Sequence, residues 1–166
     1  MNQSVFFLNG SFVPPEKATV SVLDRGFLFG DAIYEVVRVQ NRHLFRPQAH
    51  HERMSSGLDA LGIPTPFSSQ EFASLCSDLA ARNGVKAGSV YLQVTRGVCA
   101  RTHLVPRGLA PTVLGFASQS DIPKWRAHPE GITAIAVPDR RWGNCHLKTT
   151  MLLANSLAKQ QAAEIV

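Results

Sequence analysis

The sequence is poor in cysteine, in long apolar runs and in metal-binding clusters. Its three cysteines (Cys76, Cys99 and Cys145) are an odd number at unrelated spacings, so we expect free thiols in a reducing cytoplasm. No stretch approaches the roughly 18 apolar residues of a membrane span, so no membrane partner is expected. The first residues lack a basic segment followed by an apolar run, so no signal peptide is expected. The adjacent His50 and His51 have no second ligand cluster at metal spacing, so no metal site is predicted.

Charged residues are also sparse, at 17% of the chain, although the net charge is +5. The seventeen lysines and arginines are scattered, and the densest groups are Arg38, Arg42 and Arg46, and Arg140 with Arg141. There is no basic stripe with interleaved aromatic residues, so a nucleic-acid-binding module is a remote alternative. The basic balance indicates a solvated surface and sites that bind anions.

The chain does contain enough apolar material for a packed core. Hydrophobic residues make up 45% of its 166 residues, a globular, soluble profile. This length fits one domain, or one domain plus part of another.

Short apolar segments around turn residues predict two β-hairpins. Residues 5–8 and 12–13 flank Asn9-Gly10, the strongest short hairpin signal because both residues tolerate positive φ. Residues 32–39 alternate and are rich in β-branched side chains, and the chain turns back after them into residues 43–45.

Helix start and stop signals predict two helices. The first, over residues 47–61, opens with a proline and is followed by Gly62 as its C-terminal stop. The second begins with a capping box, in which Ser68 is the N-cap and Glu71 the third helical residue, and ends at Gly84.

The rest of the chain alternates between strand-like and loop-like segments. Apolar alternation predicts strands at residues 90–96, 113–117 and 131–138. Residues 97–111 form a long polar loop, a kind of segment that is often functional. Residues 151–165 predict an apolar, alanine-rich helix.

These elements predict an α+β fold in two parts. Residues 1–120 are expected to form a complete N-terminal α/β domain with antiparallel hairpins. Residues 121–166 are expected to form a linker, over residues 121–124, and the beginning of a second domain. Because the last apolar helix has no C-terminal stop signal, we expect the chain to be a fragment of a longer protein.

Lys148 lies between a predicted strand and an apolar helix. Partial desolvation there would disfavour the ammonium ion and free the amine for Schiff-base chemistry. On residue type alone, however, a surface lysine that reaches solvent from a helix start is the simpler interpretation.

Three other cationic side chains are candidates for anion binding. The planar guanidinium of Arg53 suits a phosphate, although a solvent-facing arginine on an amphipathic helix is the simpler interpretation. Arg101 and His103 are two residues apart, so on an extended segment they face one direction and could bind a carboxylate. A solvated basic loop is the alternative. Gly26 and Gly30 lack the spacing of a phosphate-binding loop and are expected to permit a turn or a close backbone approach.

Four segments, in this order, resemble the fold-type IV pyridoxal-phosphate (PLP) aminotransferases. They are Leu23-Asp24-Arg25-Gly26-Phe27-Leu28-Phe29-Gly30-Asp31-Ala32-Ile33-Tyr34-Glu35, Gln93-Val94-Thr95-Arg96-Gly97, Arg101-Thr102-His103 and Arg141-Trp142-Gly143-Asn144-Cys145-His146-Leu147-Lys148-Thr149-Thr150. The Arg-x-His segment makes the chain most similar to the D-amino-acid aminotransferases within that family. The resemblance covers essentially the whole chain and implies a D-amino-acid aminotransferase-like PLP-dependent fold.

The resemblance also implies site residues and partners. Lys148 would carry PLP and act as the general base, and Arg53 would contact the cofactor phosphate. The implied substrate-binding residues are Tyr34, Val36, Arg101 and His103. The implied protein is a homodimer that moves an amino group between a D-alanine-like amino acid and a 2-oxo acid.

Several alternatives stay open at this stage. A branched-chain amino acid aminotransferase and an aminodeoxychorismate lyase share the same fold. The chain could also be a truncated, non-catalytic domain that does not retain PLP, because the family's acidic partner for the pyridine nitrogen and its main phosphate loops are expected beyond residue 166.

Overall fold

The computed structural model describes residues 5–120 and 131–165. Its strands are β1 (Phe6–Leu8), β2 (Ser11–Val13), β3 (Ala32–Gln40), β4 (His43–Leu44), β5 (Gly88–Thr95) and β6 (Thr112–Gln119). Its helices are the 3₁₀ turn η1 (Pro15–Lys17), α1 (Arg25–Phe29), α2 (Pro47–Leu61), α3 (Ser69–Arg82) and α5 (Leu153–Ile165). The strands form one six-stranded sheet in the order β2-β1-β6-β5-β3-β4, in which all neighbours run antiparallel.

Both predicted hairpins are confirmed. Asn9 and Gly10 connect β1 to β2 with φ values of 46° and 90°, as a tight two-residue turn requires. Asn41 and Arg42 connect β3 to β4 with φ values of 50° and 66°. The strands predicted at residues 90–96 and 113–117 are confirmed as β5 and β6 with shifted ends.

Both predicted helices before β5 are also confirmed. Helix α2 ends at Gly62, which has a left-handed φ of 64°. At the start of α3, the Ser68 hydroxyl accepts from the Glu71 amide and the Glu71 carboxylate accepts from the Ser68 amide. This reciprocal capping box satisfies amide groups that a helix start leaves unpaired.

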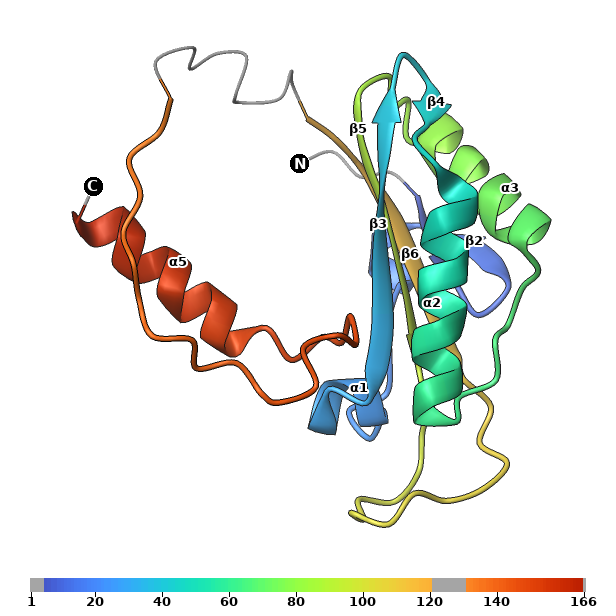
Figure 1. The fold of residues 1–166 in the computed structure, drawn as a ribbon. Helices are drawn as coiled ribbons and strands as arrows, with labels where there is room; N and C mark the ends of the chain where they lie inside the picture. Colours follow the sequence, from blue (N-terminus) through green and yellow to red (C-terminus); the bar gives the residue numbers. More distant parts are fainter. Residues whose placement is uncertain (1–4, 121–130, 166) are drawn as a thin grey trace.

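The hydrophobic core lies between the sheet and helices α2 and α3, which cover one face (Figure 1). Alternate residues of β3 and β5 point toward these helices because side chains alternate across a strand. The fully buried apolar side chains that these four elements contribute to this core are Ile33, Val37, Val39, Met54, Leu58, Phe72, Cys76, Leu79, Val90, Leu92 and Val94.

Helix α1 was not predicted, although the turn over Gly26 and Gly30 was. The Asp24 side chain caps its first turn by accepting from the Gly26 amide, and Gly30 ends it with a φ of 67°. A Cβ atom at Gly26 would overlap the Thr95 side chain, and one at Gly30 would lie 2.6 Å from Met151 Cγ. The expected turn and close approach at these glycines are therefore confirmed.

The strand predicted at residues 131–138 is wrong. A strand needs a hydrogen-bonded neighbour, and this segment pairs with no strand in the part of the chain that the structure describes. Its apolar Ile132 is 83% exposed. The linker predicted at residues 121–124 lies outside the described residues.

The C-terminal segment lies on the side of the sheet opposite α2 and α3 (Figure 1). The helix predicted at residues 151–165 is confirmed as α5, which begins two residues later and has no buried residue. Among the described residues, no helix is both long enough and apolar enough to span a membrane.

Candidate active site

Strand β3 presents two chemically different faces. Ile33 and Glu35 are fully buried on the helix-covered face, whereas Tyr34 and Val36 point to the opposite face. Strand β4 pairs only with the far end of β3, at Val39 and Gln40. The near end of β3 is therefore an edge at which another segment can pair.

The segment around Lys148 occupies this edge. The Tyr34 amide donates a 3.0 Å hydrogen bond to the Lys148 carbonyl, and Ile33 forms an isolated antiparallel bridge with Thr149. Thr149 is 5% exposed. Lys148 is thus placed by the backbone of β3, far away in sequence, and not by helix α5.

Lys148, Tyr34 and Arg53 line one cavity of about 310 Å³. This volume lies at the lower end of the roughly 300–1,000 Å³ typical of small-molecule sites. The Lys148 Nζ atom lies 4.0 Å from the centroid of the Tyr34 ring, a distance at which the ring face attracts a cation. Arg141 adds a third cationic side chain to the lining, so the cavity favours an anionic ligand.

Arg141 is partly neutralised by its own neighbour. Its Nη2 atom lies 2.7 Å from Asp139 Oδ2. Hydrogen bonds from Arg141 lower the pKa of Asp139 to about 2. Arg53 is likewise paired with a carboxylate, that of Glu35, so Lys148 is the cavity cation that has no carboxylate partner among the described residues.

Arg53 is held by Glu35, which is fully buried. Arg53 donates from Nε and Nη2 to the two Glu35 oxygens, at 2.5 and 2.7 Å. His50 Nδ1 lies 2.7 Å from the same carboxylate. The hydrogen bonds to Glu35 raise the pKa of Arg53. The Arg53 side chain nevertheless remains 55% exposed, so its position is fixed while one side stays open.

Tyr34 also begins a row of aromatic rings across the sheet. Its ring stacks on Tyr91 with centroids 5.3 Å apart, and Tyr91 stacks on Phe116 at 4.8 Å. Burial raises the pKa of Tyr91 to about 12. Val36 lies on the same face at 38% exposure but does not line the cavity.

Arg101 and His103 do not line the cavity. Both lie in the β5–β6 loop and pack on Phe29, with the Arg101 guanidinium 5.4 Å and the His103 ring 5.5 Å from its centroid. Within one chain, the structure therefore brings together Lys148, Arg53 and Tyr34 of the predicted site residues, but not the two loop residues.

A larger hollow of about 1,470 Å³ lies between the C-terminal segment and the sheet. It borders apolar residues of α1 and α5, and it does not include Lys148, Arg53 or Tyr34. We therefore take the smaller cavity as the candidate active site. Among the described residues, no group of three or more His, Cys, Asp or Glu side chains could hold a metal ion.

The sequence model of the amino-transferase class IV family matches residues 32–164. The chain belongs to the class IV aminotransferases. The D-alanine aminotransferase of Staphylococcus aureus (strain N315) is 38% identical over 159 residues, which cover 95% of this chain and 56% of that relative. The D-alanine aminotransferase of Listeria monocytogenes serotype 1/2a (strain 10403S) is 39% identical over 157 residues, or 93% and 54% of the two chains. This class IV chain spans about half the length of the curated relatives it matches.

Solved aminotransferase structures share the fold of this chain. The branched-chain amino acid aminotransferase from Escherichia coli superposes with a TM-score of 0.83 at 20% identity, over 99% of this chain and 56% of that one. A T.th. branched-chain amino acid aminotransferase complexed with N-(5'-phosphopyridoxyl)-L-glutamate has a TM-score of 0.79 at 21% identity, with the same coverage. The predicted family and fold class are confirmed.

Glu35 is the main residue of the site that the sequence did not predict. The sequence did contain a signal for Glu35, because the alternation along β3 places this carboxylate on the apolar face of the strand. A carboxylate there needs a buried partner, and His50 and Arg53 follow three residues apart on the next helix, which places them on one helical face.

Proposed function

We propose that the protein is a PLP-dependent transaminase that moves an amino group between a D-alanine-like D-amino acid and a 2-oxo acid. The observation that carries the proposal is the cavity where the Lys148 amine, the Arg53 guanidinium and the Tyr34 ring meet. The D-alanine aminotransferases at 38% and 39% identity support this choice of reaction.

The side chains of the cavity fit PLP. Lys148 offers a primary amine for the aldehyde. Arg53 offers a guanidinium for the phosphate, and no hydrogen bond among the described residues uses its Nη1 atom. The phosphopyridoxyl complex of the T.th. enzyme, which has the same fold, supports this assignment. When bound, PLP supplies the electron sink for chemistry at the α-carbon of the substrate.

In this proposal, Lys148 removes and returns the proton at the substrate α-carbon. Such a base must lie within hydrogen-bond reach of the proton that it moves. The backbone pairing of Lys148 and Thr149 with β3 fixes where the amine can act. The edge of the sheet thus orients the proton transfer.

Tyr34, Val36, Arg101 and His103 are proposed to bind the substrate, and Tyr34, Arg101 and His103 its carboxylate. Since Arg101 and His103 pack on Phe29 outside the cavity, we propose that a second copy supplies them in a homodimer. Large exposed apolar side chains nearby support an interface there, because such patches mark contact surfaces. They include Val22, Phe27 and Leu104, which are 72%, 72% and 82% exposed.

A branched-chain amino acid aminotransferase is the second candidate. Solved enzymes of that kind share the fold. The Arg101-x-His103 segment favours the D-amino-acid reaction by the resemblance described above, and the D-alanine aminotransferase relatives favour it by identity. The division into domains at residues 1–120 and 121–166, and a cytoplasmic location, belong to the same proposal.

The experiment uses the complete natural protein. After incubation with PLP and reduction with borohydride, peptide mapping is expected to find the adduct on Lys148. Lys148→Ala is expected to abolish transamination of D-alanine, whereas the control Lys159→Ala, an exposed lysine of α5, keeps it. An adduct on Lys86, Lys124 or Lys159 would refute the role of Lys148. Equal activity on L-leucine and D-alanine would refute the D-specific reaction.

A further inference from the structure

The loop that carries Arg101 and His103 has a narrow base. It leaves the sheet after Thr95 and returns at Thr112, and these two residues are paired neighbours in β5 and β6. Gly97 has a φ of 105°, and a Cβ atom there would overlap the Ala110 carbonyl. The two ends of the loop are therefore in contact.

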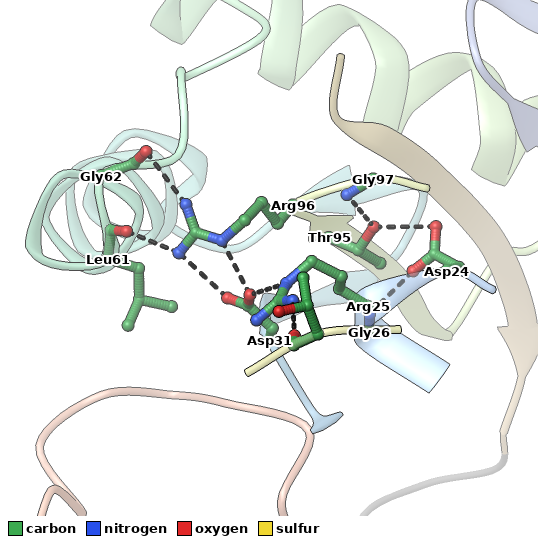
Figure 2. A network of polar contacts seen from close by, with 10 residues as sticks. Asp24, Arg25, Gly26, Asp31, Leu61, Gly62, Thr95, Arg96 and Gly97 are labelled. Atoms are coloured by element: carbon green, nitrogen blue, oxygen red, sulfur yellow. Dashed lines mark hydrogen bonds and ion pairs between the residues drawn. The ribbon is translucent and has the colours of Figure 1, made fainter. Parts of the chain in front are cut away.

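Arg25 reaches the far part of this loop from helix α1. It is only 4% exposed. Its Nε atom donates to Asp31 Oδ2 at 2.8 Å, and its Nη1 atom donates to the Thr102 carbonyl at 2.7 Å. Figure 2 shows this guanidinium beside Asp31 within a wider polar network. The fork geometry of arginine allows it to hold both acceptors at once.

Thr102 is the residue between Arg101 and His103. Its carbonyl is held by Arg25, and the side chains on both sides of it pack on Phe29. The Arg25 guanidinium also lies 4.7 Å from the centroid of the Phe29 ring. One buried arginine and one aromatic ring of the same short helix thus fix both the backbone and the side chains of this part of the loop.

Asp31 anchors Arg25 from the opposite side. It also accepts from Arg96, at 2.7 and 3.1 Å, and Arg96 donates to the carbonyls of Leu61 and Gly62 at the end of α2 (Figure 2). The carbonyls at a helix end and the carboxylate offset the two buried guanidinium charges. Arg96 therefore joins Asp31 to the helical layer, whereas Arg25 joins it to the loop.

We infer that Arg25 and Asp31 are positioning residues for the substrate carboxylate: through the Thr102 carbonyl, they hold Arg101 and His103 in the orientation that binds it. This inference rests on the proposed function, because it assumes that the loop binds substrate. Asp31 and Arg25 are assigned a positioning role because Arg25 is buried and the two side chains bond to each other, to Arg96 and to the loop.

The first test is a kinetic cycle in the complete natural protein. Arg25→Lys keeps a positive charge beside Asp31 but lacks the fork that also reaches Thr102. The KM for D-alanine is expected to rise about 10-fold, as for one lost charge-assisted hydrogen bond, with kcat changed less than about 3-fold. In the Arg101→Ala/His103→Ala background, the same change is expected to alter KM less than about 2-fold, because coupled residues are non-additive.

The matched control is Arg82→Lys. Arg82 also covers an aromatic ring, with its guanidinium 4.1 Å from the Phe12 centroid, but lies on α3, away from the loop. Arg82→Lys is expected to leave the KM for D-alanine unchanged, both in the wild-type protein and in the Arg101→Ala/His103→Ala background. An equal rise in KM for Arg25→Lys in both backgrounds would overturn the inference, because Arg25 would then act on the fold alone.

The second test is amide hydrogen exchange, which needs no turnover. Arg25→Lys is expected to speed exchange over residues 99–105, and Arg82→Lys is not. Unchanged exchange in Arg25→Lys would overturn the inference.

The outcomes also separate the inference from the proposed function. If the wild-type protein shows no transamination, the proposed function fails and the substrate role fails with it, while exchange still shows whether Arg25 orders the loop. If the wild-type protein is active but the Arg101→Ala/His103→Ala variant leaves KM unchanged, the inference fails and the transaminase stands.

Discussion

At the scale of residues, Arg53 combines a structural contact with an open side that can bind a ligand. Glu35 holds two of its nitrogen atoms, while its side chain stays 55% exposed beside the cavity. Because the carboxylate has oriented the guanidinium in advance, little conformational entropy remains to be lost when a phosphate binds.

Arg53→Ala is therefore expected to weaken PLP binding more than it slows the reaction at saturating cofactor. The loss of one charge-assisted hydrogen bond costs about 1.5–3 kcal/mol, or roughly 10- to 150-fold in the dissociation constant. Titration of the complete protein with PLP measures this constant, and Arg82→Ala serves as the control. An unchanged dissociation constant would show that Arg53 only pairs with Glu35.

The surroundings of Asp31 predict how the stability of the protein depends on pH. Burial by itself raises its pKa, but the hydrogen bonds and charges of Arg96 and Arg25 outweigh burial and hold the pKa below its ordinary value. A carboxyl whose pKa is lower in the folded state contributes stability above its unfolded pKa, and that stability is lost as the pH falls through the folded pKa.

The free energy of unfolding of the wild-type protein is thus expected to fall as the pH drops below about 4, the usual unfolded value for aspartate. Asp31→Asn is expected to be less stable at neutral pH and to lose its part of this acid dependence. Urea unfolding between pH 7 and pH 3 measures both effects, with the exposed Asp59→Asn of α2 as the control. Parallel pH profiles for wild type and Asp31→Asn would contradict the assignment.

At the scale of elements, local sequence signals predicted an element correctly where its hydrogen-bond partners lie within the same short segment. The capping box of α3 satisfies its amides within four residues, so Ser68 and Glu71 were sufficient to place that helix. Residues 131–138 show the opposite case. Their alternation suits a strand, but a strand is completed by a neighbour, and the described part of the chain provides none.

The β5–β6 loop offers a comparison of two glycines within one element. Gly97 has a φ of 105° and no space for a Cβ atom, whereas Gly108 has a φ of 73° with nothing within 4 Å. Gly108→Ala is expected to cost about 1–2 kcal/mol from the left-handed backbone alone. Gly97→Ala is expected to cost more, at least about 3 kcal/mol, because backbone strain and steric overlap add. Urea unfolding compares the two, and equal losses would contradict the close contact at the base of the loop.

At the scale of the whole molecule, the layer of helices α2 and α3 and the C-terminal segment differ in how much of their apolar surface is buried. Helices α2 and α3 bury their apolar faces on the sheet. Helix α5 buries no residue, and its Leu153, Leu157 and Ile165 are 73%, 62% and 64% exposed. Apolar surface of this kind favours association.

A polypeptide of residues 1–166 alone is therefore expected to self-associate and to turn over little or no substrate. Low turnover is expected because residues 1–166 cover 56% of the length of the matched Staphylococcus aureus relative, and the family resemblance implies an acidic partner for the pyridine nitrogen in the remainder of such proteins. Light scattering, an absorbance spectrum with PLP and turnover on one sample measure this. Leu153→Ser/Leu157→Ser is expected to reduce association. Full turnover from a monodisperse sample of this polypeptide would contradict the expectation.

The sequence by itself determined the two hairpins, helices α2 and α3, and the family. Asn9-Gly10, Gly62 and the capping box act through φ preferences and neighbouring hydrogen bonds, so they need no distant partner. The four segments between Leu23 and Thr150 indicated the family by their order along the chain, and the family match confirms it.

Only the tertiary structure decided how the candidate site is assembled. Lys148 meets Tyr34 because its backbone pairs with the open edge of β3, Glu35 meets Arg53 because α2 packs over that strand, and Arg25 meets Thr102 because the loop folds over α1. Each contact joins residues far apart in sequence. Their energies depend on burial and orientation, which a linear pattern of residue types does not contain.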